Sequence, residues 1–300
     1  MTIETPLKFC IVNGYPKRSR DALDATNVTQ AHELYLMCLQ KMLPNSTFDL
    51  LFIADPETTM PAIEEINAYD GIIWTGSNLT IYHQDEEVTR QIEYSQSVFD
   101  AGVPQFGSCW ATQMAAMAAG GECRKNPNGR EWSIAYDITV TEEGKNHPMY
   151  IGKQHQFNAF IMHLDEVCSV PEGATVLATN GHTGVQAIAV KHSNGEFWST
   201  QYHPEFTLCE MAQLVGARKT AIVKEGFFNN EDEMVPLVND MLALSKKPDN
   251  AELRQKLNIG DSILDDDIRQ KEVHNWVEYL VIPTKNSGQR VVERQLSFTY

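Results

Sequence analysis

The sequence predicts an α/β fold: a three-layer sandwich with a mainly parallel central sheet, followed by a helical C-terminal extension. Short, nearly continuous apolar runs alternate with stretches of helical periodicity through the first two-thirds of the chain. Such runs are typical of parallel strands that helices cover on both faces. After residue 206 the pattern becomes mainly helical. The composition, 42% hydrophobic and 21% charged, is that of an ordinary globular protein.

The first half of the chain supplies the strands and helices of the sandwich. Strands are expected at residues 7–13, 47–53, 70–75 and 103–106, and helices at 28–43, 85–101 and 110–119. The second helix begins with Asp-Glu-Glu, which suits the positive end of a helix dipole. Gly120 and Gly121 end the third.

The second half changes character twice. Extended segments separated by Asn-Gly turn signals are expected at residues 134–141, 176–179, 186–190 and 197–202. Helices are expected at 207–224, 234–244 and 261–280, with a linker at 245–250. We therefore predict a domain of residues 1–206 and a mainly helical extension of residues 207–300 that packs on it.

The strongest chemical signal is the segment Phe106-Gly107-Ser108-Cys109-Trp110-Ala111, between a predicted strand and an alanine-rich predicted helix. This is the layout of a nucleophile elbow, a sharp strand-to-helix turn that needs small neighbours. The turn sets Cys109 at a helix N-terminus, where backbone N–H groups and the dipole favour a thiolate. The alternative is a buried structural cysteine.

A second signal, Tyr202-His203-Pro204-Glu205-Phe206, follows the last predicted strand of the sheet. A cysteine nucleophile needs a base, and the base needs an acceptor that fixes its tautomer. His203 and Glu205 supply both, and Pro204 stiffens the backbone between them. Alone, this motif is equally compatible with a surface turn. Because it occurs together with the elbow, we predict a Cys109–His203–Glu205 triad.

Together these motifs resemble those of the class I glutamine amidotransferases, in which the nucleophile turn reads Gly-x-Cys-x-Gly and the base motif reads His-Pro-Glu. The resemblance spans residues 7–206 and implies the flavodoxin-like fold of that family. It implies that Gln113 helps to hold the substrate. His163 and Asp165, in an H-x-D segment, are either substrate-side residues or members of a loop hydrogen-bond network. By the same resemblance, the oxyanion is held by backbone N–H groups of Gly76 or Ser77 and of Trp110.

Two departures from the family pattern narrow the comparison. Ala111 replaces the second elbow glycine, and the loop that begins Gly76-Ser77-Asn78-Leu79 lacks the usual Gly-Pro. These departures bring the chain closer to stand-alone members similar to the glutamine domain of GMP synthase, some of which cleave other γ-glutamyl amides.

The resemblance implies hydrolysis of the glutamine side-chain amide through a γ-glutamyl thioester, with the ammonia supplied to a separate synthase. No phosphate-loop motif is present, so the acceptor reaction is expected on another chain. The alternative is a stand-alone γ-glutamyl peptide or γ-glutamyl amine hydrolase. A third reading is a non-catalytic regulatory module with the same fold. The extension is expected to form a homodimer contact or to restrict the active-site entrance.

The remaining features exclude several classes of function. A net charge of −16 disfavours nucleic acid and anionic membranes as partners. No apolar run reaches the length that a membrane span needs. Six cysteines without a C-x-x-C pair favour a reducing, cytoplasmic location. No metal is expected, because four scattered histidines lack the spacing of metal ligands: His147, His155, His182 and His192. The expected mechanism requires no organic cofactor.

Overall fold

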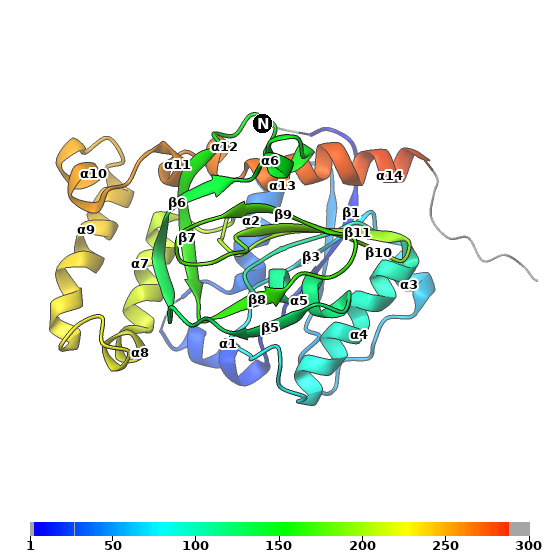
Figure 1. The fold of residues 1–300 in the computed structure, drawn as a ribbon, viewed down its shortest axis with the longest axis horizontal. Helices are drawn as coiled ribbons and strands as arrows, with labels where there is room; N and C mark the ends of the chain where they lie inside the picture. The colour runs from blue at the N-terminus through cyan, green and yellow to red at the C-terminus, as the bar shows by residue number, and fades with distance from the viewer. Residues whose placement is uncertain (1–2, 27, 288–300) are drawn as a thin grey trace, which may run out of the picture.

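A nine-stranded sheet forms the centre of the protein in the computed structural model, which describes residues 3–26 and 28–287 (Figure 1). Within those residues the strand order is β2-β1-β3-β4-β11-β10-β9-β6-β7. Its parallel part consists of β2 (Thr47–Leu51), β1 (Lys8–Val12), β3 (Gly71–Trp74), β4 (Gln105–Ser108) and β11 (Gly195–Thr200). The predicted fold class is therefore confirmed.

The other strands extend the sheet by antiparallel pairing. They are β10 (Ala187–His192), β9 (Ala174–Thr179), β6 (Glu131–Val140) and β7 (Gln156–His163). A smaller sheet pairs β5 (Glu122–Lys125) with β8 (Asp165–Ser169). The strands β5, β7 and β8 were not predicted from the sequence. The fourth strand begins and ends two residues later than predicted, because Gly107 and Ser108 belong to β4.

Helices cover both faces of the sheet, because the parallel strands are apolar on both sides. One face packs against α3 (Ile63–Asn67), α4 (Glu86–Ala101) and α5 (Trp110–Ala118). The other packs against α2 (Ala31–Met42), α13 (Lys271–Trp276) and the π-helix η3 (Val277–Val281). All four residues of β3 are buried, whereas the edge strand β2 has none buried. This contrast is expected between a central strand and an edge strand.

Two short helices near the chain's start and middle are mostly polar: α1 (Lys17–Asp24) and α6 (Glu142–Lys145). The 3₁₀ turn η1 (Pro148–Tyr150) instead buries Met149 and Tyr150 in the core. In α1 only Leu23 is buried, so its sequence carries almost no apolar periodicity. This explains why the sequence analysis missed it.

The C-terminal region divides into two parts (Figure 1). The first gathers beside β6 and β7 around a third apolar cluster and consists of α7 (Leu208–Ala217), α8 (Lys219–Lys224), η2 (Glu231–Met234), α9 (Val235–Lys246), α10 (Ala251–Leu257) and α11 (Asp261–Leu264). The second runs back across the sheet through α12 (Asp266–Arg269), α13, η3 and α14 (Ile282–Ser287). The predicted helix 207–224 is thus split at Arg218, and α10 lies just beyond the predicted linker.

Trp276 anchors the second part to the sheet. Its ring lies 5.8 Å from that of Phe9 on β1 and 5.6 Å from that of Phe106 on β4, measured between centroids. A Cβ atom on Gly71 would lie 2.7 Å from the indole, so the glycine makes room for it. The extension therefore completes the main core. The boundary at residue 206 stays a prediction, and the stretch 288–300 lies outside the described residues.

A buried polar network connects α13 to the segment before β7 and to the segment after β11. Lys153 Nζ lies 2.6 and 2.7 Å from the two carboxylate oxygens of Glu272 on α13. The Tyr202 hydroxyl also donates to Glu272, and it lies 2.8 Å from the Tyr150 hydroxyl. Burial lowers the pKa of Lys153, although the Glu272 carboxylate opposes that shift. The network thus ends on the residue that precedes His203.

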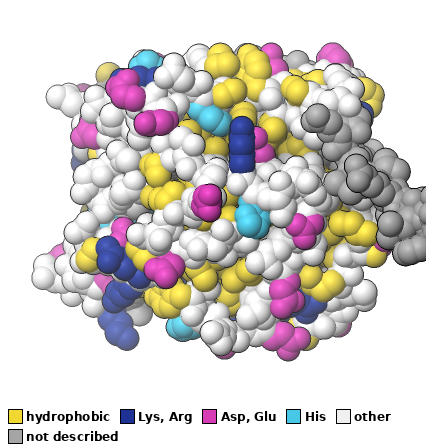
Figure 2. All heavy atoms as spheres, turned by 45° about the vertical axis from the view of Figure 1, so that its right-hand side comes forward, with side chains coloured by type: hydrophobic (Ala, Val, Ile, Leu, Met, Phe, Trp, Pro, Cys, Tyr) yellow, Lys and Arg dark blue, Asp and Glu magenta, His cyan; other side chains and the backbone are white. Residues whose placement is uncertain are grey.

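The surface shows no large charged area in the view of Figure 2, where acidic, basic and apolar side chains are interspersed. Among the described residues, no helix combines the length and apolarity that crossing a membrane requires.

Candidate active site

Cys109 lies at the turn between β4 and α5 with a backbone φ of +56°. Positive φ is uncommon for a residue with a side chain and marks local strain. A Cβ atom on Gly107 would lie 2.4 Å from the Cβ of Ala111 and 2.5 Å from the carbonyl oxygen of Trp74. The elbow therefore needs glycine at position 107, whereas alanine at 111 fits because Gly107 leaves it space.

His203 and Glu205 meet Cys109 because β4 and β11 are neighbouring parallel strands. Ser108 is in register with Thr200, and the backbone N–H of Cys109 donates to the Thr200 carbonyl at 2.7 Å. His203 Nδ1 lies 2.7 Å from Glu205 Oε1. The three predicted triad residues are thus side by side, and all are buried.

Three further contacts fix these side chains. The Ser108 hydroxyl donates to Glu205 Oε1 at 2.8 Å, although the sequence analysis treated Ser108 only as a small neighbour of the nucleophile. The His203 ring stacks on Phe206, with centroids 4.1 Å apart and an interplanar angle of 17°. The Cys109 thiol donates to the Met162 carbonyl across 3.6 Å.

The electrostatics favour a protonated His203. Burial alone would lower its pKa, but the Glu205 carboxylate and the Cys109 sulfur outweigh burial and raise the pKa to about 10. An imidazolium beside the sulfur is the state that can later give a proton to a leaving amine.

The predicted oxyanion donors border the same site. A Cβ atom on Gly76 would lie 3.4 Å from His203 Cε1 and 3.9 Å from Cys109 Cβ, so the loop after β3 passes close to both. The Ser77 hydroxyl donates to the Gly14 carbonyl at 2.8 Å, which holds this loop in place. Trp110 is the first residue of α5, where a backbone N–H has no partner within the helix.

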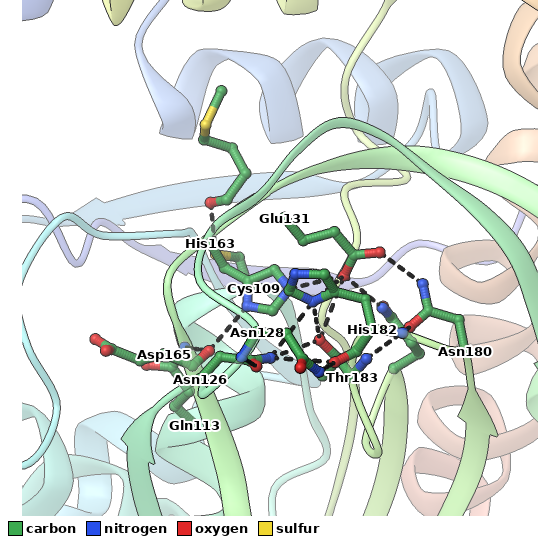
Figure 3. Close-up of polar contacts among 12 residues, drawn as sticks. Cys109, Gln113, Asn126, Asn128, Glu131, His163, Asp165, Asn180, His182 and Thr183 are labelled. Carbon is green, nitrogen blue, oxygen red and sulfur yellow. Dashed lines mark hydrogen bonds and ion pairs between the residues drawn. The ribbon is translucent and has the colours of Figure 1, made fainter. Parts of the chain in front are cut away.

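The three predicted substrate-side residues converge on one backbone carbonyl. Gln113 Nε2 donates to the carbonyl oxygen of Asp165 at 3.1 Å, and His163 Nδ1 lies 2.9 Å from the same oxygen. Figure 3 shows these side chains together near Cys109. The side chain of Asp165 accepts from the Tyr82 hydroxyl at 3.1 Å. Burial raises the pKa of Asp165, opposed by Tyr82 and His163.

A cavity of about 210 Å³ opens above the cysteine. It brings together seven of the nine predicted site residues: Ser77, Cys109, Trp110, Gln113, His163, Asp165 and His203. Gly76 and Glu205 lie behind this lining.

A family model, glutamine amidotransferase class I, matches residues 47–220 of the chain. The chain belongs to this family.

Individual relatives agree with this assignment. A γ-glutamyl-L-1-hydroxyisopropylamide hydrolase of Pseudomonas is 34% identical over 242 residues, which cover 79% of this chain and 80% of the relative. A glutamine-hydrolysing GMP synthase component from Methanocaldococcus jannaschii is 28% identical over 172 residues, covering 57% of this chain and 77% of the relative. A glutamine amidotransferase structure from Thermotoga maritima superposes with a TM-score of 0.62 at 15% identity, covering 92% of this chain and 98% of the other, and so supports the fold. The predicted amidotransferase-type hydrolytic enzyme is confirmed.

In this class I amidotransferase, several cavity residues were missed by sequence reasoning. They come from the loop after β1, the residue before β6 and the helical extension: Tyr15, Arg130, Leu214 and Arg218. Arg130 forms a two-point ion pair with Glu225 at 2.7 and 2.8 Å. Burial raises the pKa of Tyr15 to about 12, and the nearby Arg218 guanidinium opposes that shift. No local motif marks these residues, because only the fold brings them to the cysteine.

A polar cluster behind the cavity has the composition of a metal site. Glu131, His163 and His182 bring one ligand atom each within 4.8 Å of one another (Figure 3), although the sequence analysis set His182 aside. His163 Nε2 lies 3.0 Å from Glu131 Oε2, and the carboxylate also accepts from Asn180 at 2.6 Å and Gln186 at 2.8 Å. These protein donors already satisfy the carboxylate. We therefore interpret the cluster as a hydrogen-bond network that orients His163.

Proposed function

We propose that this chain hydrolyses γ-glutamyl amides through a thioester on Cys109. The observation that carries the proposal is the geometry around the sulfur: a strained elbow cysteine and a buried His203–Glu205 pair at 2.7 Å, beneath a cavity. Together these supply a nucleophile, an acid–base group and a binding space for an acyl-transfer reaction.

In the first step, the Cys109 thiolate attacks the γ-carbonyl carbon, and the carbonyl oxygen takes the negative charge. The N–H groups of Trp110 and of Gly76 or Ser77 hold that oxygen. The His203 imidazolium gives its proton to the amide nitrogen, the C–N bond breaks, and the amine departs. This leaves a γ-glutamyl thioester and a neutral His203.

In the second step, the neutral His203 takes a proton from water, and the hydroxide attacks the thioester carbon. The C–S bond breaks, glutamate leaves, and the thiolate–imidazolium pair is restored. Glu205 keeps Nδ1 of His203 protonated throughout, and Ser108 holds Glu205 in position.

Charges in the cavity suit the zwitterionic head of a γ-glutamyl group. Asp165 lines one part of the cavity and attracts the α-ammonium group. Arg130 and Arg218 line another part. Arg130 is engaged by Glu225, so we assign the α-carboxylate to Arg218.

A stand-alone hydrolase of γ-glutamyl conjugates is the better-supported version of this activity. An alignment that covers 79% of the chain is longer than residues 1–206, so the Pseudomonas hydrolase resembles part of the extension as well. That extension supplies Leu214 and Arg218 to the cavity. The second candidate, hydrolysis of free glutamine for a synthase partner, rests on the similarity to the GMP synthase component.

The test is release of glutamate from glutamine and from a panel of γ-glutamyl amides, alone and with fractions that contain other proteins. Cys109→Ala should abolish turnover and prevent a γ-glutamyl adduct in mass spectra of the trapped enzyme. Cys168→Ala is the matched control, because Cys168 is an exposed thiol outside the cavity. Wild-type rates in Cys109→Ala would refute the assignment. Turnover of glutamine alone, accelerated by a second protein, would favour the synthase-partner version.

A further inference from the structure

A second cavity, of about 300 Å³, lies directly beside the active-site cavity, between α1 and the end of α7. The two cavities share Asn78 and Arg218 as lining residues. Asn78 and Arg218 therefore stand between the space above the cysteine and the space beside α1.

The wall of this second cavity is polar but contains no acid among the described residues. Its hydroxyl and amide groups come from Ser19, Thr26 and Asn78, and its apolar part includes Ala22, Leu23 and Ala217. Its guanidinium groups are those of Arg18 and Arg218.

Arg18 is already neutralised, because its guanidinium forms a two-point ion pair with Glu87, with Nη2 2.7 Å from Oε2. An ammonium group would find no carboxylate in this wall to offset the loss of its hydration, which disfavours its burial there. A neutral group with a hydroxyl would find both hydrogen-bonding partners and apolar surface.

We propose that this space is a leaving-amine cavity, which receives the amine half of a γ-glutamyl amide and selects short, neutral, hydroxyl-bearing aliphatic amines. This inference rests on the proposed function. The scissile C–N bond lies above Cys109, the glutamyl half fills the active-site cavity, and the amine half points past Asn78 and Arg218. After the C–N bond breaks, the amine carries the proton received from His203 as it leaves toward the surface.

The volume of the cavity favours such a conjugate over glutamine as a substrate. A molecule the size of water needs only about 10–15 Å³ of such space, so the ammonia of glutamine would leave most of it empty. A short alkyl amine would displace that water and bury its apolar carbons. Binding energy gained there is unavailable to glutamine, and it therefore sets the preference between the two substrates.

The helical extension builds one wall of the leaving-amine cavity. Ala217 ends α7, and Arg218 follows it. The opposite wall is α1, where Ala22 is exposed. A bulky side chain at position 22 would fill the cavity without entering the core.

The experiment compares four substrates: glutamine, γ-glutamyl-ethylamide, γ-glutamyl-2-hydroxyethylamide and γ-glutamyl-4-aminobutylamide. For the wild-type enzyme we expect kcat/KM for the hydroxyethylamide to exceed that for the cationic aminobutylamide about tenfold or more. In Ala22→Trp, the ratio of kcat/KM for the hydroxyethylamide to that for glutamine should fall about tenfold.

Ala243→Trp is the matched control, because Ala243 is exposed on α9 and does not line either cavity. It should leave the substrate ratio within about twofold of wild type. An unchanged ratio in folded Ala22→Trp, or a wild-type preference for the aminobutylamide, would overturn the leaving-amine cavity while the hydrolase activity stands. No turnover of any of the four substrates by the wild-type enzyme would overturn the proposed function itself.

Discussion

Replacing Trp276 by alanine tests how strongly the C-terminal helices stabilise the catalytic sheet. The indole is fully buried between Phe9 and Phe106. An aromatic side chain of this size buries about 150–250 Å², and at about 25 cal/mol per Å² its loss removes about 4–6 kcal/mol. Measured Trp→Ala substitutions in cores cost about 3–5 kcal/mol, which is the loss we expect in the free energy of unfolding.

The assay is urea unfolding followed by far-ultraviolet circular dichroism, which does not depend on the fluorescence of the deleted indole. Tyr279→Ala is the matched control, since Tyr279 lies three residues further along the same segment and is 38% exposed. It should cost less than about 1 kcal/mol. A Trp276→Ala loss below about 1 kcal/mol, or equal losses in the two variants, would refute the claim that the extension completes the core.

Three other predictions concern the active site. Ser108→Ala removes a hydrogen bond to the Glu205 carboxylate that is worth about 1.5–3 kcal/mol. The value of kcat/KM should therefore fall about tenfold or more. An unchanged value would show that Ser108 does not position Glu205. The pKa of His203 is raised in the folded protein, so protonation of its ring stabilises the fold. This contribution to the free energy of unfolding is complete below about pH 6.5 and is lost as the pH rises through about 10. The rate of hydrolysis should therefore fall as the pH approaches 10. In Glu205→Gln this fall should occur at lower pH, because the carboxylate that raises the pKa of His203 is gone; an unchanged profile would contradict that effect of Glu205 on His203. Gly107→Ala would place a methyl group 2.4 Å from the Ala111 Cβ, so thermal unfolding should reveal a loss of about 1–3 kcal/mol or more, and wild-type stability would argue against a tight elbow.

The proximity of Cys109, His203 and Glu205 was predictable because the sequence signals for it are local. The elbow at Cys109 and the His203-Pro204-Glu205 motif each occupy a few consecutive residues, and each follows an apolar strand. Neighbouring parallel strands then bring the two motifs together at one edge of the sheet. The family resemblance and the hydrolytic chemistry rested mainly on these two segments, whereas the fold class followed from the alternation of apolar runs with helical stretches.

The surroundings of the cysteine were not predictable in this way. Arg218 and Tyr15 are about two hundred residues apart in sequence, and both reach the cavity only because α7 packs across the sheet edge near the loop after β1. The polar helix α1 lacks apolar periodicity, so neither this helix nor the wall that it forms in the second cavity could be predicted from the sequence. Likewise, β7 carries the segment Gln156–His163, whose Phe-Ile-Met run fits helix and strand equally well.

The position of α13 also orders events during synthesis of the chain. Phe9 and Phe106 are made early, but the indole that covers them belongs to residue 276 and follows them out of the ribosome after a long interval. Until that residue is made, the indole cannot cover the two rings, and exposed apolar surface of this kind favours self-association. Tyr202, which precedes His203, likewise has no carboxylate partner until Glu272 has been made. A chain that lacks α13 would therefore leave the Phe9 and Phe106 rings uncovered and Tyr202 without its carboxylate partner.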